Sequence, residues 1–139
     1  MLLVLLRLAG GSLICLSLFH IVLWRTLGWG LELERLSPLG RSVFAVHTFF
    51  IAFVLFALGL LSLIEPALLL VPSDLARCLL LGVVAFWIAR SVLQPLVFDR
   101  AMRHGWTRSL PLRIGVNFLW LAYVAVYGAA LLVQWEVSK

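Results

Sequence analysis

Residues 43–64 read VFAVHTFFIAFVLFALGLLSLI, and this apolar run lies between Arg41 and the dipeptide Glu65-Pro66. A transmembrane helix needs about 20 consecutive, mainly apolar residues to cross the hydrocarbon core of a bilayer. The run has that length, and His47 is its one ionisable residue. The sequence therefore predicts a membrane-spanning helix at this position.

Three further apolar runs lie on either side of it, at residues 8–24, 78–98 and 114–135. Over all 139 residues, hydrophobic residues make up 64% and charged residues 12%. A typical soluble domain is roughly half apolar and a quarter charged, so a water-soluble fold of this chain would expose large apolar patches. We therefore expect one transmembrane domain over residues 1–139, an all-α, integral membrane four-helix bundle.

Local signals indicate where two helices begin and where one bends. Ser37 precedes a proline and Ser73 precedes an acid, and both patterns are typical of an N-cap followed by the first helical turn. The third helix is expected to run from Ser73 to about His104, with a kink at Pro95 because proline cannot donate a main-chain hydrogen bond. The Gly-Gly-Ser sequence at residues 10–12 predicts a thin face that another helix can approach closely.

The formal net charge of +5 does not indicate a nucleic-acid partner, because the basic residues lie between apolar runs as they do in membrane loops. The two cysteines, Cys15 and Cys78, form no CxxC pair, and no metal site is predicted. The sequence also has no HExxH, GxSxG, P-loop or dinucleotide-binding motif. These absences favour a function other than catalysis.

A set of polar side chains inside the spans is the main functional lead. Ionisable residues within a membrane are costly and usually have a role. The depth of each polar residue can be counted from the flanking charges at 1.5 Å per residue. By this count, five polar residues lie about 6–13 Å inside one half of the membrane, and the opposite half has no comparable set. The candidate polar pocket comprises His20, His47, Arg90, Gln94 and Asn117, with Asp99 at its margin.

Arg90 and the two histidines of this set each have two interpretations. Arg90 either extends toward the lipid headgroups with its stem in the apolar layer or contacts a ligand. His20 and His47 either hydrogen-bond to neighbouring helices or serve as the two axial ligands of a haem b. A quinone headgroup is a further candidate ligand for the pocket. Arginines near the same surface either follow the charge bias of membrane loops or bind anionic lipid headgroups; these are Arg25, Arg41, Arg100 and Arg103.

The chain also resembles a group of proteins. The stretch Leu36-Ser37-Pro38-Leu39 with Val46-His47-Thr48-Phe49-Phe50-Ile51, and Phe86-Trp87 followed by Arg90, Gln94 and Phe98-Asp99, are similar to small, uncharacterised four-span proteins of bacterial inner membranes. The resemblance implies a bacterial inner-membrane setting and carries no activity.

Two functions from different classes follow from these observations. The first is a non-catalytic accessory or structural subunit of a larger membrane complex, whose partners are lipids and other membrane subunits or further copies of the chain. The second is a small binding or carrier protein whose cytoplasmic-side pocket holds a lipid, a quinone or haem b.

The orientation follows from the Lys and Arg residues of the short loops, which are enriched on the cytoplasmic side. Loop one joins the first two apolar runs, and loop three joins the last two. Together they carry seven basic residues, namely Arg25, Arg35, Arg41, Arg100, Arg103, Arg108 and Arg113. The other side carries three, namely Arg7, Arg77 and Lys139. We therefore expect a multi-pass protein of the bacterial inner membrane with both termini in the periplasm.

This orientation predicts the behaviour of a reporter fused after Lys139. Alkaline phosphatase fused there is expected to be active, because that enzyme works only in the periplasm, whereas green fluorescent protein exported to the same place is expected to be dark. The opposite pattern, with a fluorescent fusion and an inactive phosphatase, would reverse the assignment.

Overall fold

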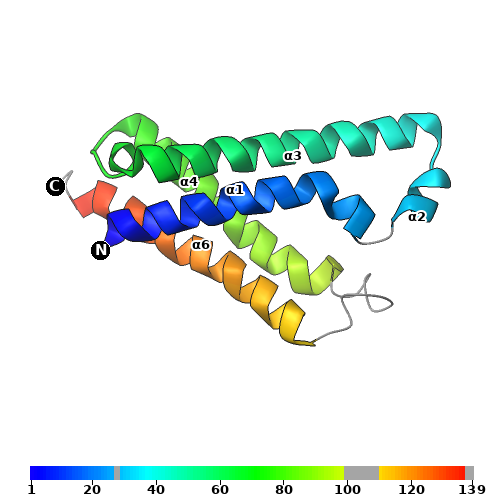
Figure 1. The fold of residues 1–139 in the computed structure, drawn as a ribbon. Helices are drawn as coiled ribbons and strands as arrows, with labels where there is room; N and C mark the ends of the chain where they lie inside the picture. Colours follow the sequence, from blue (N-terminus) through cyan, green and yellow to red (C-terminus); the bar gives the residue numbers. More distant parts are fainter. Residues whose placement is uncertain (27–28, 99–109, 137–139) are drawn as a thin grey trace. The chain divides into compact units, whose positions relative to one another are not determined.

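The computed structural model describes residues 1–26, 29–98 and 110–136, which form helices and short connections without a β-strand (Figure 1). In chain order, the elements are α1 (Leu2–Thr26), α2 (Gly30–Glu34), α3 (Pro38–Ile64), the 3₁₀ helix η1 (Pro66–Leu69), α4 (Asp74–Leu93), the π-helix η2 (Gln94–Phe98) and α6 (Leu110–Glu136). The all-α class is therefore confirmed.

Four of these helical segments are long and apolar enough to cross a membrane, as the sequence predicts. They cover Leu2–Val22, Pro38–Ile64, Asp74–Val97 and Arg113–Glu136. The first helix begins before the predicted residue 8, so the exposed Arg7 is part of α1. Arginine is a good helix former and can extend its charged end toward the membrane surface, so it does not end a helix there.

Both predicted N-caps are confirmed. The Ser37 hydroxyl accepts a hydrogen bond from Gly40 N at 3.1 Å, and α3 starts at the proline that follows Ser37. The Ser73 hydroxyl accepts one from Ala76 N at 3.1 Å, and α4 starts at the next residue. Each serine thus satisfies one main-chain N–H that has no partner within its own helix.

At Pro95, where the sequence predicts a kink, the structure has a change in helix type. The α-helical pattern of α4 ends at Leu93, and Pro95 is the second residue of η2. Since Pro95 has no N–H to donate to the carbonyl one turn earlier, the backbone widens into a π-helical turn at this point. The part of the expected helix from Asp99 to His104 lies outside the described residues.

The chain folds as two compact units, which we describe separately. One comprises residues 7–65, and the other comprises residues 1–6 and 66–139. In both units large apolar side chains are exposed: Phe49, Phe53, Phe86 and Phe118 are each half or more exposed. Contiguous apolar surface of this kind is unfavourable in water and is suited to contact with lipid.

In the unit of residues 7–65, small residues bring α1 and α3 together. A methyl group added to Gly10 would lie 2.6 Å from Leu63 N and 2.7 Å from Gly59 O. The Ser17 hydroxyl donates a 2.7 Å hydrogen bond to Ala52 O further along the same pair of helices. Close backbone approach and hydrogen bonds between helices are the main attractions available in lipid, so this contact fixes the α1–α3 pair.

The predicted thin face is therefore confirmed at one of its glycines. Gly10 makes the close contact, whereas nothing lies within 4 Å of a methyl group added to Gly11. Gly11 is the next residue along the helix, and successive residues of an α-helix point in different directions.

In the other unit, α4 and α6 pack through aromatic side chains. Trp87 is buried and stacks on Trp120, with ring centroids 5.2 Å apart and planes inclined by 17°. Tyr123 lies 4.4 Å from Trp87, centroid to centroid. Offset aromatic pairs contribute about 0.5–1.5 kcal/mol beyond the area that they bury. This cluster holds the two helices at a defined rotation.

The connection between η1 and α4 is closed by Gln134, which is fully buried on α6. Its amide nitrogen donates to Leu69 O at 2.8 Å and to Val71 O at 2.9 Å, and its oxygen accepts from Ser73 N at 3.1 Å. One side chain thus satisfies three main-chain groups at a break between helices. The polar residue is needed here because the break leaves main-chain groups without a helical partner.

The Gly10 contact predicts unequal effects of alanine at neighbouring positions. Gly10→Ala is expected to lower the free energy of unfolding by about 1–3 kcal/mol, the usual cost of overpacking, since the backbone of α3 cannot yield as a side chain would. Gly11→Ala is the matched control and is expected to be neutral or slightly stabilising. Unfolding in a detergent titration followed by circular dichroism measures both, and equal effects would contradict the contact.

Candidate functional site

The two histidines of the predicted pocket lie on different helices of one unit. His20, on α1, is half-buried, and its Nδ1 is 2.8 Å from Leu16 O of the same helix. His47, on α3, is exposed and makes no hydrogen bond within the described part of the chain. It lines a shallow depression of about 350 Å³ together with Ser42 and three apolar residues, Val43, Val46 and Phe50.

Axial ligation of a haem by these histidines stays a hypothesis. An imidazole that bonds a main-chain carbonyl through one nitrogen keeps the other for a ligand, as metal-binding histidines do, and His20 has this arrangement. The described contacts do not join His20 to His47. The same part of the chain holds no group of three or more His, Cys, Asp or Glu residues able to bind a metal ion.

Arg90 contacts the aromatic cluster of the second unit. It lies on α4, half-buried, with its guanidinium carbon 5.1 Å from the centre of the Trp120 ring on α6. A guanidinium over an aromatic face contributes about 0.5–2 kcal/mol, more where water is excluded. The sequence predicts lipid headgroups or a ligand as partners of Arg90, and nothing in it indicates this ring.

The remaining polar residues lie on these two helices. Gln94 is buried at the start of η2, and its main-chain N–H bonds to Arg90 O. Asn117 is half-buried on α6 and donates to Arg113 O, one turn earlier, at 2.9 Å. The structure thus brings Arg90 and Gln94 together on consecutive turns and connects Arg90 to α6 one turn from Asn117. Asp99, Arg100 and Arg103 lie outside the described residues, as does the side chain of Arg25.

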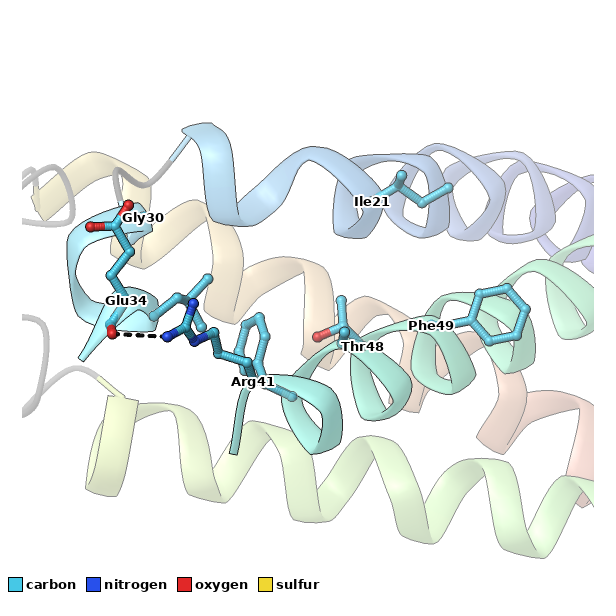
Figure 2. A pocket seen from close by; sticks show the side chains of 9 residues that line it. Ile21, Gly30, Glu34, Arg41, Thr48 and Phe49 are labelled. Atoms are coloured by element: carbon cyan, nitrogen blue, oxygen red, sulfur yellow. Dashed lines mark hydrogen bonds between the residues drawn. The ribbon is translucent and has the colours of Figure 1, made fainter. Parts of the chain in front are cut away.

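A cavity larger than the depression beside His47 lies in the unit of residues 7–65, at the ends of α1 and α3 that loop one connects (Figure 2). Its volume is about 490 Å³. The wall is mainly apolar and includes Ile21, Leu33, Phe44, Ala45 and Phe49. Clefts of about 300–1,000 Å³ with such walls and a few polar groups are typical of small-molecule sites.

The polar groups of this cavity gather at one end. Arg41 and Glu34 are both exposed there, beside the short helix α2, and Thr48 lies between Arg41 and Phe49 (Figure 2). Arg41 donates from Nε to Leu36 O and from a terminal nitrogen to Glu34 O, both at 3.3 Å. Glu34 is the last residue of α2 and Leu36 lies just after it, so Arg41 also satisfies acceptors that the short helix leaves unbonded.

Sequence reasoning found only part of this cavity. Arg41 is predicted from the sequence as a lipid-headgroup candidate, whereas no helix is predicted at α2. Ile21 and Thr48 are sequence neighbours of His20 and His47, which were singled out instead. No pattern in the sequence shows that Ile21 and Thr48 border a cavity. Which side chains of α1 and α3 face each other depends on how the two helices are rotated about their axes.

The described lining of this cavity combines many apolar groups with three polar side chains, those of Glu34, Arg41 and Thr48. What it offers is an apolar interior with one carboxylate, one guanidinium and one hydroxyl toward one end. An amphipathic molecule matches that distribution.

These features define a class, the polytopic α-helical membrane proteins with four spanning segments. Comparison of the chain with protein-family models, with curated protein sequences and with solved structures finds no match.

Proposed function

We propose that this chain is a non-catalytic membrane protein that holds an amphipathic membrane molecule in the cavity bordered by α1, α2 and α3. The single observation that carries the proposal is the cavity of about 490 Å³, apolar along its length and charged at one end. A membrane lipid is the favoured ligand, because such molecules are abundant around any spanning helix. A quinone would present a similar apolar body and is the alternative ligand.

The position of the cavity along the spans supports this proposal. Arg41 precedes the apolar part of α3, and Phe49 lies eight residues further on, which corresponds to about 12 Å of helix. The charged end therefore lies near the headgroup layer and the apolar end near the acyl chains. With the expected orientation, this is the cytoplasmic side of a bacterial inner membrane.

Filling the cavity tests the proposal. Ala45→Trp places a large ring in the cavity wall and is expected to reduce the stoichiometric ligand retained after gentle solubilisation by tenfold or more, since no room for its apolar part remains. Ala57→Trp is the matched control, because Ala57 is an exposed alanine on the same helix and lines neither cavity. Native mass spectrometry measures the bound mass and identifies it as lipid, quinone or haem b.

The circular dichroism and melting temperature of both variants must match those of the unchanged protein for this comparison to count. If Ala45→Trp retains as much bound lipid or quinone as Ala57→Trp, the cavity is not the site. If the unchanged protein carries no bound molecule even when lipid is supplied in excess, the proposal fails altogether.

A second candidate function is that of an accessory or structural subunit of a larger membrane complex, including a homo-oligomer. The observation that favours it is the exposure of His47 on α3, without a hydrogen bond to the described residues. A polar side chain that faces lipid without a partner is unfavourable. A helix of another chain would supply that partner.

Replacing this histidine by leucine tests the subunit hypothesis. A hydrogen bond between membrane helices contributes about 0.6–2 kcal/mol, so His47→Leu is expected to weaken association about three- to thirtyfold. His20→Leu is the control, because His20 bonds within its own helix. Blue-native electrophoresis and mass photometry of the solubilised protein measure the complex. An unchanged complex in His47→Leu would remove the observation that supports this candidate.

A further inference from the structure

We propose that the cavity between α1, α2 and α3 selects a zwitterionic phospholipid, one whose phosphate is followed by a primary ammonium group. This inference rests on the proposed function and names the class of its ligand. It follows from two opposite charges at the polar end of the cavity, Glu34 and Arg41, which do not form an ion pair with each other.

Arg41 is positioned to bind the phosphate. Its bonds to Leu36 O and Glu34 O, both 3.3 Å long, hold the guanidinium at the cavity entrance. These bonds leave further N–H groups of the guanidinium without a partner in the described part of the chain. A guanidinium also matches the geometry of a phosphate better than an ammonium does. Two main-chain acceptors thus orient a donor that has bonding capacity left for the ligand.

Glu34 supplies the complementary charge. Its carboxylate is exposed and has no ion pair or hydrogen bond within the described residues. Figure 2 shows the carboxylate extending away from the main-chain carbonyl of Glu34 that Arg41 bonds, so the carboxylate and the guanidinium are not paired. A carboxylate accepts hydrogen bonds only, and a primary ammonium is the lipid group that donates several.

The rest of the cavity matches the rest of such a lipid. Thr48 lies seven residues after Arg41, about 10 Å deeper along α3, and its hydroxyl makes no hydrogen bond to a described residue. It lies where the ester carbonyls of a phospholipid follow the phosphate. Beyond Thr48, Phe49 and Ile21 form an apolar wall for an acyl chain.

Other headgroups fit this end of the cavity less well. A lipid that carries only negative charge places its phosphate near the Glu34 carboxylate as well as near Arg41, and gives the carboxylate no positively charged partner. A choline headgroup keeps the positive charge but has no N–H to donate to the carboxylate. The order of affinity is therefore expected to be phosphatidylethanolamine, then phosphatidylcholine, then phosphatidylglycerol.

Native mass spectrometry tests this order of affinity. The delipidated chain is titrated with each of the three lipids, which carry identical acyl chains. Phosphatidylethanolamine is expected to bind about fivefold more tightly than phosphatidylglycerol, the size of one partly exposed charge pair. Glu34→Gln is expected to abolish this preference, and Arg41→Gln to weaken all three lipids. Glu65→Gln and Arg35→Gln are matched controls, because both residues are exposed and line neither cavity.

The outcomes separate this inference from the proposed function. If phosphatidylglycerol binds as tightly as phosphatidylethanolamine and Glu34→Gln changes neither, the headgroup assignment is overturned while the cavity remains a lipid site. If none of the three lipids binds at one molecule per chain, and Ala45→Trp has no effect on any bound molecule, both proposals are overturned.

Discussion

The absence of water from the hydrocarbon core is the constraint on which the rest of this structure depends. Each main-chain N–H and C=O must find its partner within the protein, which long helices achieve by themselves and helix breaks do not. At the break between η1 and α4, Gln134 bonds two carbonyls and one N–H. At the end of α2, Arg41 bonds two carbonyls. At both places a polar side chain thus satisfies main-chain groups that the helices leave unbonded.

The same constraint explains why two pairs of helices are joined differently. Apolar side chains gain little by leaving lipid for another helix, so each pair needs a specific contact. The α1–α3 pair uses the close approach at Gly10 and the bond from Ser17 to Ala52 O. The α4–α6 pair uses stacked aromatic rings with a guanidinium above one of them. Beyond the Gly10 contact, toward loop one, α1 and α3 border a cavity that α2 helps to line.

Much of the fold was predictable from local sequence. The four apolar runs and the serine caps at Ser37 and Ser73 each depend on residues within one or two turns, and they appear in the structure. At Pro95, where a kink is predicted, the helix changes to the π type. The candidate site was less predictable. Depth along a helix can be counted from the sequence, but rotation about the helix axis cannot. His20 and His47 were grouped by depth, whereas His47 is exposed and the cavity lies beside their neighbours Ile21 and Thr48.

The sequence by itself determined that the chain is a four-span helical membrane protein, because hydrophobic length and charged boundaries are properties of each segment alone. Only the tertiary structure decided which of the two adjacent glycines joins α1 to α3, that Gln134 closes a helix break 61–65 residues away in the chain, and that Arg90 packs on Trp120. It also decided that Glu34 and Arg41 lie together at the entrance of an apolar cavity. These features depend on how helices are rotated and paired, which side-chain packing sets and no single segment contains.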